Sequence, residues 1–205
     1  MPQCGLLSNP LVLSLKYPIS LSQVSPRTVL SSFLAHSQTK ASSPPIPRTT
    51  VKVTKLLAVG DTAPNFRLPT SNGSYLSLAD FLGKKNVVVY FYPKDFTQGC
   101  TAEACSFRDS YESFKDLGAE VIGISSDGQN SHRDFAQQHH LPFILLSDVD
   151  GAVRKAYGVK KTLGLFAGRV SFVVDKKGII RHIFSSQTRA TAHVGKALIL
   201  LKSIA

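Results

Sequence analysis

The feature that most constrains the fold is an apolar run followed closely by an amphipathic helix. Residues Val87 to Tyr92 are six consecutive apolar or aromatic residues, which is typical of a strand buried on both faces of a sheet. Apolar residues then recur at three- or four-residue intervals: Ala104, Phe107, Tyr111 and Phe114. Gly118 is expected to end this helix. The sequence therefore predicts a buried strand that leads through a short loop into a helix.

Two cysteines lie at the start of this helix. Cys100 is placed where the helix is expected to begin, and Cys105 follows five residues later. The free N–H groups and the dipole of a helix N-terminus stabilise a thiolate, so we expect a thiol pKa below the ~8.5 of free cysteine. A second thiol nearby can trap the product when the first is oxidised. The pair indicates a cysteine-based redox enzyme; a small buried core cysteine is the alternative at Cys100.

The N-terminal segment has a different composition from the rest of the chain. No Asp or Glu precedes Asp61, although six Lys or Arg residues do, and the first fifty residues contain ten serines. Such a segment is typical of an organelle transit peptide, so residues 1–56 are interpreted as a transit peptide and linker. A secretory signal fits less well, because the apolar stretch 11–15 contains Ser14 and is followed by Lys16. A disordered tail without a targeting role is the alternative.

Charge and cysteine spacing exclude several classes of function. The net charge of +11 falls to +5 for residues 61–205, where 18 basic and 13 acidic side chains remain. Because this part has no long basic run, no nucleic-acid surface is expected. No apolar stretch reaches the ~18 to 20 residues of a membrane span. Cys4 lies in the N-terminal segment, and Cys-x4-Cys without a second ligand pair argues against zinc, so no metal or cofactor is expected.

Residues 57–205 are predicted to form one α/β domain. The expected elements are strands at 65–68 and 75–78 around the turn 71–73, a short helix at 77–82, strands at 86–92, 120–125 and 143–146, helices at 131–140 and 151–157, strands at 170–175 and 179–184, and a helix at 191–204. Ser131 and Asp134 are expected to cap the 131–140 helix. This order predicts a central mixed β-sheet flanked by helices, with a thiol at a strand–helix junction, which resembles the thioredoxin fold.

The residues around Cys100 carry a more specific resemblance. The pattern Pro93-x3-Thr97-x2-Cys100 is similar to the active-site loop of the peroxiredoxins. The run from Thr97 through Gly99-Cys100-Thr101 to Cys105 resembles the Q type, also called the bacterioferritin comigratory protein type. Further similarity lies at 107–109, 118–125, 145–148 and 168–169, so the resemblance covers about residues 57–205. Together with the N-terminal segment, the chain resembles the plant chloroplast members. One departure is Gln98, where the Q type usually has Pro.

The resemblance implies a role for each of five residues. Cys100 would attack a peroxide and become a sulfenic acid. The hydroxyl of Thr97 would accept from the peroxide and donate to the thiolate. Arg169 would lie beside Cys100, favour its thiolate and hydrogen-bond the oxygens in the transition state. Pro93 would shape the pocket and exclude water. Cys105 would be the resolving cysteine, which forms a disulfide with Cys100 and releases water.

Helix geometry adds a condition to this disulfide. Five helical residues rotate by ~500° and rise by ~7.5 Å, which places the Cα atoms of Cys100 and Cys105 ~8.6 Å apart. A disulfide needs a Cα separation of at most about 7 Å. The first turn must therefore unwind before the bond can close. Arg108 is a competing arginine, but it is expected to pair with Asp109 or Glu112 instead.

The resemblance also implies partners and a location. Thioredoxin would be the reductant, and hydrogen peroxide and alkyl hydroperoxides would be the substrates, in antioxidant defence. An intrachain disulfide requires no dimer, so a monomer is expected. The chloroplast is the expected location, with stroma, lumen and peripheral thylakoid association left open and the mitochondrion as the alternative. Two other functions compete: a dithiol–disulfide oxidoreductase, which normally uses Cys-x2-Cys, and a redox sensor without peroxidase turnover.

Overall fold

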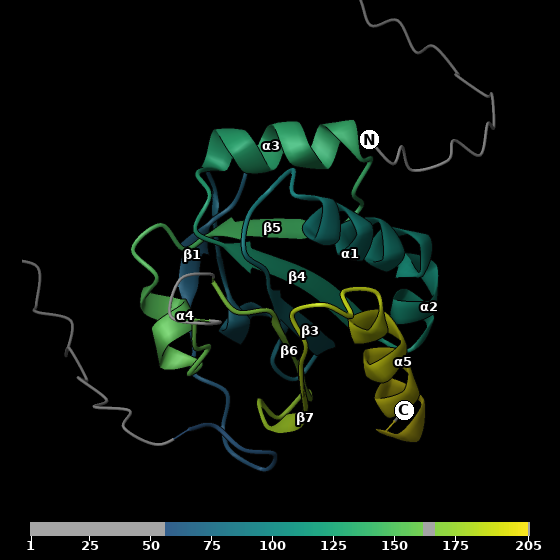
Figure 1. The fold of residues 1–205 in the computed structure, drawn as a ribbon. Coiled ribbons are helices and arrows are strands. Elements are labelled where there is room, and N and C mark those ends of the chain that lie inside the picture. Colours follow the sequence, from purple (N-terminus) through teal and green to yellow (C-terminus); the bar gives the residue numbers. More distant parts are fainter. Residues whose placement is uncertain (1–55, 162–166, 205) are drawn as a thin grey trace, which may run out of the picture. The chain divides into compact units, whose positions relative to one another are not determined.

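A five-stranded mixed sheet forms the centre of the computed structural model, which describes residues 56–161 and 167–204 (Figure 1). The strand order is β5-β4-β3-β6-β7. The bounds are Asn86–Phe91 for β3, Ala119–Ser125 for β4, Ile144–Ser147 for β5, Val170–Val174 for β6 and Ile180–Ser185 for β7. The pairs β3–β4 and β4–β5 are parallel, whereas β3–β6 and β6–β7 are antiparallel. The predicted mixed sheet is therefore confirmed, and β6 lies beside β3 as expected. Nearly all of the predicted transit peptide and linker lies outside the described residues.

Strand β3 is fully buried because its side chains enter two separate apolar layers. Val88 and Tyr90 belong to one layer, and Val87, Val89 and Phe91 belong to the other. Successive side chains of a strand point to opposite faces, so the apolar run of β3 serves both layers at once. The end of this central strand is a rigid support for the loop that follows it.

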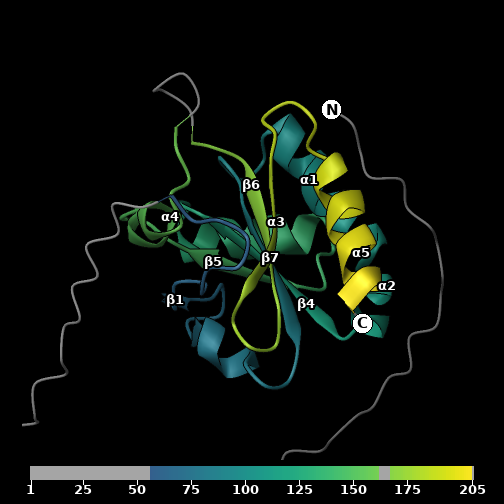
Figure 2. The same ribbon diagram turned by 90° about the horizontal axis from the view of Figure 1, so that it is seen from below.

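The layer that contains Cys100 lies between the sheet and four helices. These are α1 (Gln98–Asp109), α2 (Tyr111–Asp116), α3 (Gln129–Gln138) and α5 (Ala192–Ile204). Phe107 of α1, Phe114 of α2, Phe135 of α3 and Leu201 of α5 are all buried in it. Figure 2 shows α1, α2 and α5 together on one side of the sheet. Cys100 is therefore inside a packed core rather than at a mobile surface.

The opposite face of the sheet is covered by shorter elements. The hairpin of β1 (Arg67–Pro69) and β2 (Tyr75–Ser77) leads into the 3₁₀ helix η1 (Leu78–Phe81). The short helix α4 (Ala152–Ala156) lies on the same side in Figure 2. Leu68, Leu78 and Tyr157 bury their side chains in this second layer. The sequence predicted each of these elements, with bounds that differ by at most two residues.

Two local predictions were wrong. The helix expected to continue from Cys100 to Gly118 is interrupted at Ser110, whose φ of −103° and ψ of 4° depart from helical values and separate α1 from α2. Helix α3 begins at Gln129 with Gly128 as its N-cap, so Ser131 does not cap it. Instead, the Ser131 hydroxyl donates to Asp95 Oδ2 at 2.7 Å. The Ser131 side chain, which local sequence assigned to a helix cap, is therefore bound by the buried carboxylate of Asp95.

Candidate active site

Cys100 is the third residue of α1, at the junction that the sequence predicted. Thr97 is the N-cap residue, and its carbonyl accepts a hydrogen bond of 2.8 Å from Thr101 N. Cys100 is a free thiol with 1% of its surface exposed. A sulfur atom in the first turn of a helix faces unpaired backbone N–H groups and the positive end of the helix dipole. The position suits a thiolate, although the surroundings are otherwise apolar.

Arg169 supplies a positive charge to this thiol. Because Val170 pairs with Phe91 in the β3–β6 ladder, Arg169 lies beside the end of β3. Its Nη2 donates to Cys100 Sγ at 3.3 Å, and the side chain is only 4% exposed. Gly99 allows this approach, since a Cβ there would lie 3.2 Å from Arg169 Nη2. The predicted contact between Arg169 and Cys100 is present.

Glu103 was missed by sequence reasoning and is the second partner of Arg169. It lies one turn after Cys100, is fully buried, and forms an ion pair with Arg169 Nη1. Burial raises the pKa of Glu103 to about 8, and the attraction of Arg169 offsets only part of this effect. A signal was available: residues three apart share a helix face, so an acid at 103 is placed beside Cys100.

His193 of α5 lies next to Glu103. Burial lowers its pKa to about 4, so the ring is neutral near pH 7. Its Nε2–H donates to Ser186 O at 3.1 Å, and the Ser171 hydroxyl donates to Nδ1 at 2.7 Å. Nδ1 lies 3.7 Å from Glu103 Oε1, but a neutral ring forms no ion pair there. His193 therefore leaves Arg169 as the charged partner of Glu103.

Pro93 and Thr97 lie in the loop between β3 and α1. Pro93 is half-buried and directly follows Tyr92, whose N–H donates to Ile124 O at 3.2 Å. Thr97 is exposed, and its hydroxyl donates to Lys94 O at 3.0 Å. Among the described residues, no hydrogen bond joins Thr97 Oγ1 to Cys100 Sγ. The threonine is at the predicted place in the loop, and its hydroxyl is directed to Lys94 O.

A second buried polar group holds this loop in place. Asp95 accepts hydrogen bonds from the Tyr92 hydroxyl at 2.7 Å and from the Ser131 hydroxyl, and its Oδ2 lies 2.9 Å from His132 Nδ1. Phe96 adopts a φ of +60°, a left-handed conformation that is unusual for a bulky residue. No sequence signal pointed to Asp95 or His132, because 37 residues separate them.

The remaining predicted residues are placed as follows. Cys105 is buried in α1, which runs without interruption from Cys100 to Cys105, and the free thiol of Cys100 shows that the two are not bonded to each other. Arg108 pairs with Asp109 at 2.7 Å, as predicted, and does not contact Cys100 Sγ. Within residues 56–161 and 167–204, no group of three or more His, Cys, Asp or Glu side chains is arranged to hold a metal ion.

The fold and the site define a class of thiol-dependent oxidoreductases: a thioredoxin-like sheet with a buried thiol at a helix start beside a guanidinium group. The model of the AhpC/TSA family matches residues 59–183. The chain belongs to this family and, by its relatives, to the peroxiredoxin Q group within it.

The relatives are similar in sequence over most of the described residues. "Peroxiredoxin Q, chloroplastic" of Oryza sativa subsp. japonica is 49% identical over 146 residues, which cover 71% of this chain and 67% of the relative. The protein of the same name from Sedum lineare is 46% identical and covers 82% and 89%. Among solved structures, peroxidoxin BcpB from Mycobacterium tuberculosis has a TM-score of 0.67 at 37% identity, covering 72% of this chain and 97% of that chain. Peroxiredoxin Q of Xanthomonas campestris has a TM-score of 0.63 at 29% identity, covering 67% and 90%.

Proposed function

We propose that this peroxiredoxin reduces hydrogen peroxide and organic hydroperoxides with Cys100 as the nucleophile. The observation that carries the proposal is the contact between Arg169 Nη2 and Cys100 Sγ at 3.3 Å, within a buried site. The thiolate attacks one peroxide oxygen, so that an S–O bond forms and the O–O bond breaks. The other oxygen leaves with the bonding electron pair and takes a proton, as water or an alcohol. Cys100 is left as a sulfenic acid.

The neighbouring residues serve the charge that moves in this step. The guanidinium of Arg169 stabilises the thiolate before attack and the departing oxygen during it, in a site that excludes most water. Burial alone would lower the pKa of Arg169, but attraction to Glu103 and then to Cys100 raises it, so the group stays charged. Thr97 would turn its hydroxyl from Lys94 O to the peroxide. Pro93 would shape the pocket and exclude water, and it contributes no reacting atom.

Cys105 would complete the cycle as the resolving cysteine. Its thiolate attacks the sulfenic sulfur of Cys100, a disulfide forms, and water leaves. Because α1 is intact between the two residues, the ~8.6 Å separation of an ideal helix applies, and the first turn must unwind. Thioredoxin would then reduce the exposed disulfide by thiol–disulfide exchange and return α1 to its helical state.

Hydrogen exchange in the two redox forms tests the unwinding. Oxidised protein is expected to lose amide protection over residues 100–106, while strands β3 and β6 keep theirs, because only the helix start must open. Equal protection of residues 100–106 in both forms would contradict the proposal. The same comparison on Cys105→Ser protein is the control, since that variant cannot form the bond.

The proposed setting is the chloroplast. The plant relatives are named chloroplastic, and residues 1–56 have the composition of a transit peptide. The described helices include none with the length and apolar character needed to cross a membrane. The intrachain disulfide fits a monomeric enzyme. Its proposed place is the stroma, the thylakoid lumen or the thylakoid surface, and import into mitochondria is the alternative. Fluorescence from the N-terminal segment fused to a reporter would separate these locations.

An assay with peroxide, thioredoxin, thioredoxin reductase and NADPH tests the activity. Peroxide-dependent NADPH oxidation that requires all components is the expected result. NADPH oxidation with a disulfide substrate but not with peroxide would indicate a dithiol–disulfide oxidoreductase. One equivalent of peroxide consumed, with no turnover in the presence of thioredoxin, would indicate a redox sensor.

A further inference from the structure

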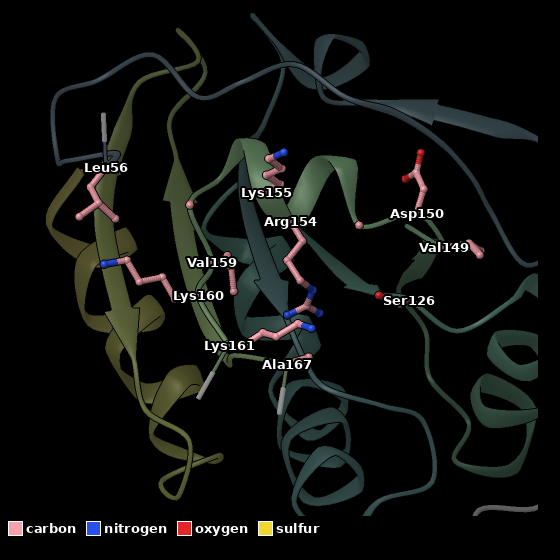
Figure 3. Close-up of a pocket in the computed structure, with 12 residues that line it drawn as sticks. Leu56, Ser126, Val149, Asp150, Arg154, Lys155, Val159, Lys160, Lys161 and Ala167 are labelled. Carbon is pink, nitrogen blue, oxygen red and sulfur yellow. The ribbon is translucent and has the colours of Figure 1, made fainter. Parts of the chain in front are cut away.

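Arg154 of α4 is a buried arginine with no part in the proposed reaction steps. Only 8% of its surface is exposed, although it lies on a helix of five residues. In Figure 3 its side chain extends from α4 toward the chain segment of Ala167, whereas the neighbouring Lys155 points the other way. A guanidinium group is rarely buried unless its donors are used.

Both ends of the guanidinium group donate to backbone carbonyls close to the site. Arg154 Nη2 donates to Tyr92 O at 2.6 Å, and Arg154 Nη1 donates to Gly168 O at 2.7 Å. Tyr92 directly precedes Pro93, and Gly168 directly precedes Arg169. One side chain therefore joins the two backbone segments that carry the loop of Cys100 and the arginine that contacts its sulfur.

These two segments need such a link because the sheet ends just before them. The ladder between β3 and β6 ends at the pair Phe91–Val170. Beyond that pair, the segments that contain Tyr92 and Gly168 are no longer joined by ladder hydrogen bonds. We propose that Arg154 is a positioning residue for the peroxidase reaction, which clamps these segments together and so fixes Arg169 against Cys100.

Arg154 is itself held firmly enough to act as a clamp. Its backbone N–H donates to Asp148 Oδ2 at 2.8 Å, and Val153 N donates to Asp148 Oδ1 at 3.1 Å. Asp148 is fully buried, and its own N–H donates to Ser125 O at 2.8 Å, at the end of β4. The guanidinium carbon also lies 5.6 Å from the centre of the Phe91 ring. Arg154 is thus anchored at the carboxyl ends of the neighbouring strands β3 and β4.

The positive charge of Arg154 and the geometry of its two hydrogen bonds can be tested separately. Burial lowers the pKa of Arg154, while the attractions of Asp148, Tyr92 and Cys100 act in the opposite direction, so its charge also reaches the thiolate. Lysine keeps a positive charge but lacks the planar fork that serves two fixed acceptors. Comparing Arg154→Lys with Arg154→Met therefore separates a clamp from a remote charge.

The test measures the rate of the peroxide step by stopped flow from pH 5 to pH 9 in full-length protein. This inference rests on the proposed peroxidase activity, which the wild-type rate establishes separately. We expect Arg154→Met to lower the second-order rate constant by ~10- to 100-fold, as expected for a small displacement of a reacting pair. Arg154→Lys should recover at most part of the loss. The matched control is Lys155→Met on the exposed face of α4, which should keep the wild-type rate.

Three results would overturn the clamp. The first is a wild-type rate and pH profile in folded Arg154→Met protein. The second is full recovery by Arg154→Lys, which would leave only a remote charge. The third is a smaller active fraction whose remaining molecules react at the wild-type rate, which would mean a purely structural role. If Arg154→Met does not fold, the rate of Arg154→Lys decides alone: a partial loss supports the clamp, and a wild-type rate contradicts it.

Discussion

Two buried polar clusters include residues of the segment 92–103, and they differ in how completely their hydrogen bonds are satisfied. The anchoring cluster consists of Tyr92, Asp95, Ser131 and His132. Its hydroxyl, carboxylate and ring atoms all have partners, including a contact of 3.1 Å between His132 Nε2 and Leu146 O. It therefore fixes the loop as a purely structural network would.

The thiol cluster consists of Cys100, Glu103, Arg169 and His193, and it is incompletely satisfied. In the described part of the chain, Glu103 Oε1 and Arg169 Nε are buried without a hydrogen-bond partner. A buried polar atom without a partner costs about 1–3 kcal/mol. In the thiol cluster the unpaired groups lie beside Cys100, where a substrate or a moving charge can use them.

The two carboxylates show the same contrast in their pKa values. Burial raises the pKa of both, but hydrogen bonds and charge from His132, with bonds from Ser131 and Tyr92, lower that of Asp95 below its usual value. Glu103 has only Arg169, so burial prevails and its pKa rises to about 8. One carboxylate is held as a fixed anion, and the other lies near its point of ionisation at neutral pH.

The largest expected effect follows from removing the thiol. Cys100→Ser should abolish peroxidase activity, because the thiol cluster contains no second thiol. Cys105→Ser should consume one equivalent of peroxide and stop, because the sulfenic acid has no resolving partner. Peroxide consumption followed over several equivalents distinguishes the two, and normal turnover by Cys100→Ser protein would refute the assignment.

The next effect concerns Arg169 and Thr97, the two residues proposed to stabilise the reacting atoms. Arg169→Ala should slow the peroxide step by ~10²- to 10³-fold, as expected for an oxyanion-type donor, and Thr97→Val should also slow it. Arg108→Ala is the control, since Arg108 is engaged with Asp109 instead of the thiol. Second-order rate constants with hydrogen peroxide provide the measurement. Unchanged values in both site variants would mean that the contact of Arg169 with Cys100 has no catalytic role.

Opposite pH dependences of stability are expected from the two carboxylates. The raised pKa of Glu103 means that its protonated form is favoured in the fold, so wild-type stability relative to Glu103→Gln should fall as pH rises from about 4.5 to about 8. The lowered pKa of Asp95 means that stability relative to Asp95→Asn should fall as pH drops below 3.8. Urea unfolding across this pH range measures both. If the stability difference between wild type and variant changed with pH in the same direction for Glu103→Gln and Asp95→Asn, the contrast between the two carboxylates would be contradicted.

The smallest effect is expected at Gln98. It is exposed and is the first residue of α1, a position whose N–H has no partner within the helix and where proline is common. Gln98→Pro should therefore leave the peroxide rate nearly unchanged and alter stability by less than ~1 kcal/mol. A tenfold change in rate would show that the departure from the usual Q-type sequence alters the pocket.

Much of the fold followed from local patterns. The apolar runs of β3 and β4, the turns at glycines and the periodic apolar residues of α1 are signals contained within ten or so residues. The loop motif also placed Pro93, Thr97 and Cys100 together, because they are close in the chain.

The parts that escaped prediction depend on pairs of polar residues far apart in sequence. Asp95 meets His132, Ser131 meets Asp95, and Arg154 meets Tyr92, across 36 to 62 residues. Such pairs leave no periodic pattern, and Ser131 was wrongly assigned as a cap because the acid that binds it lies in another segment. The orientation of the Thr97 hydroxyl depends on its bond to Lys94 O, which no sequence pattern encodes.

The central claim is that the incompletely satisfied cluster makes Cys100 the thiol that peroxide oxidises. Trapping the sulfenic acid tests it most directly: full-length Cys105→Ser protein is treated with one equivalent of hydrogen peroxide and dimedone, and the modified residue is located by peptide mass. A single adduct on Cys100 is the predicted result. Peroxide consumption with the adduct on another residue, or with no adduct on Cys100, would contradict the account.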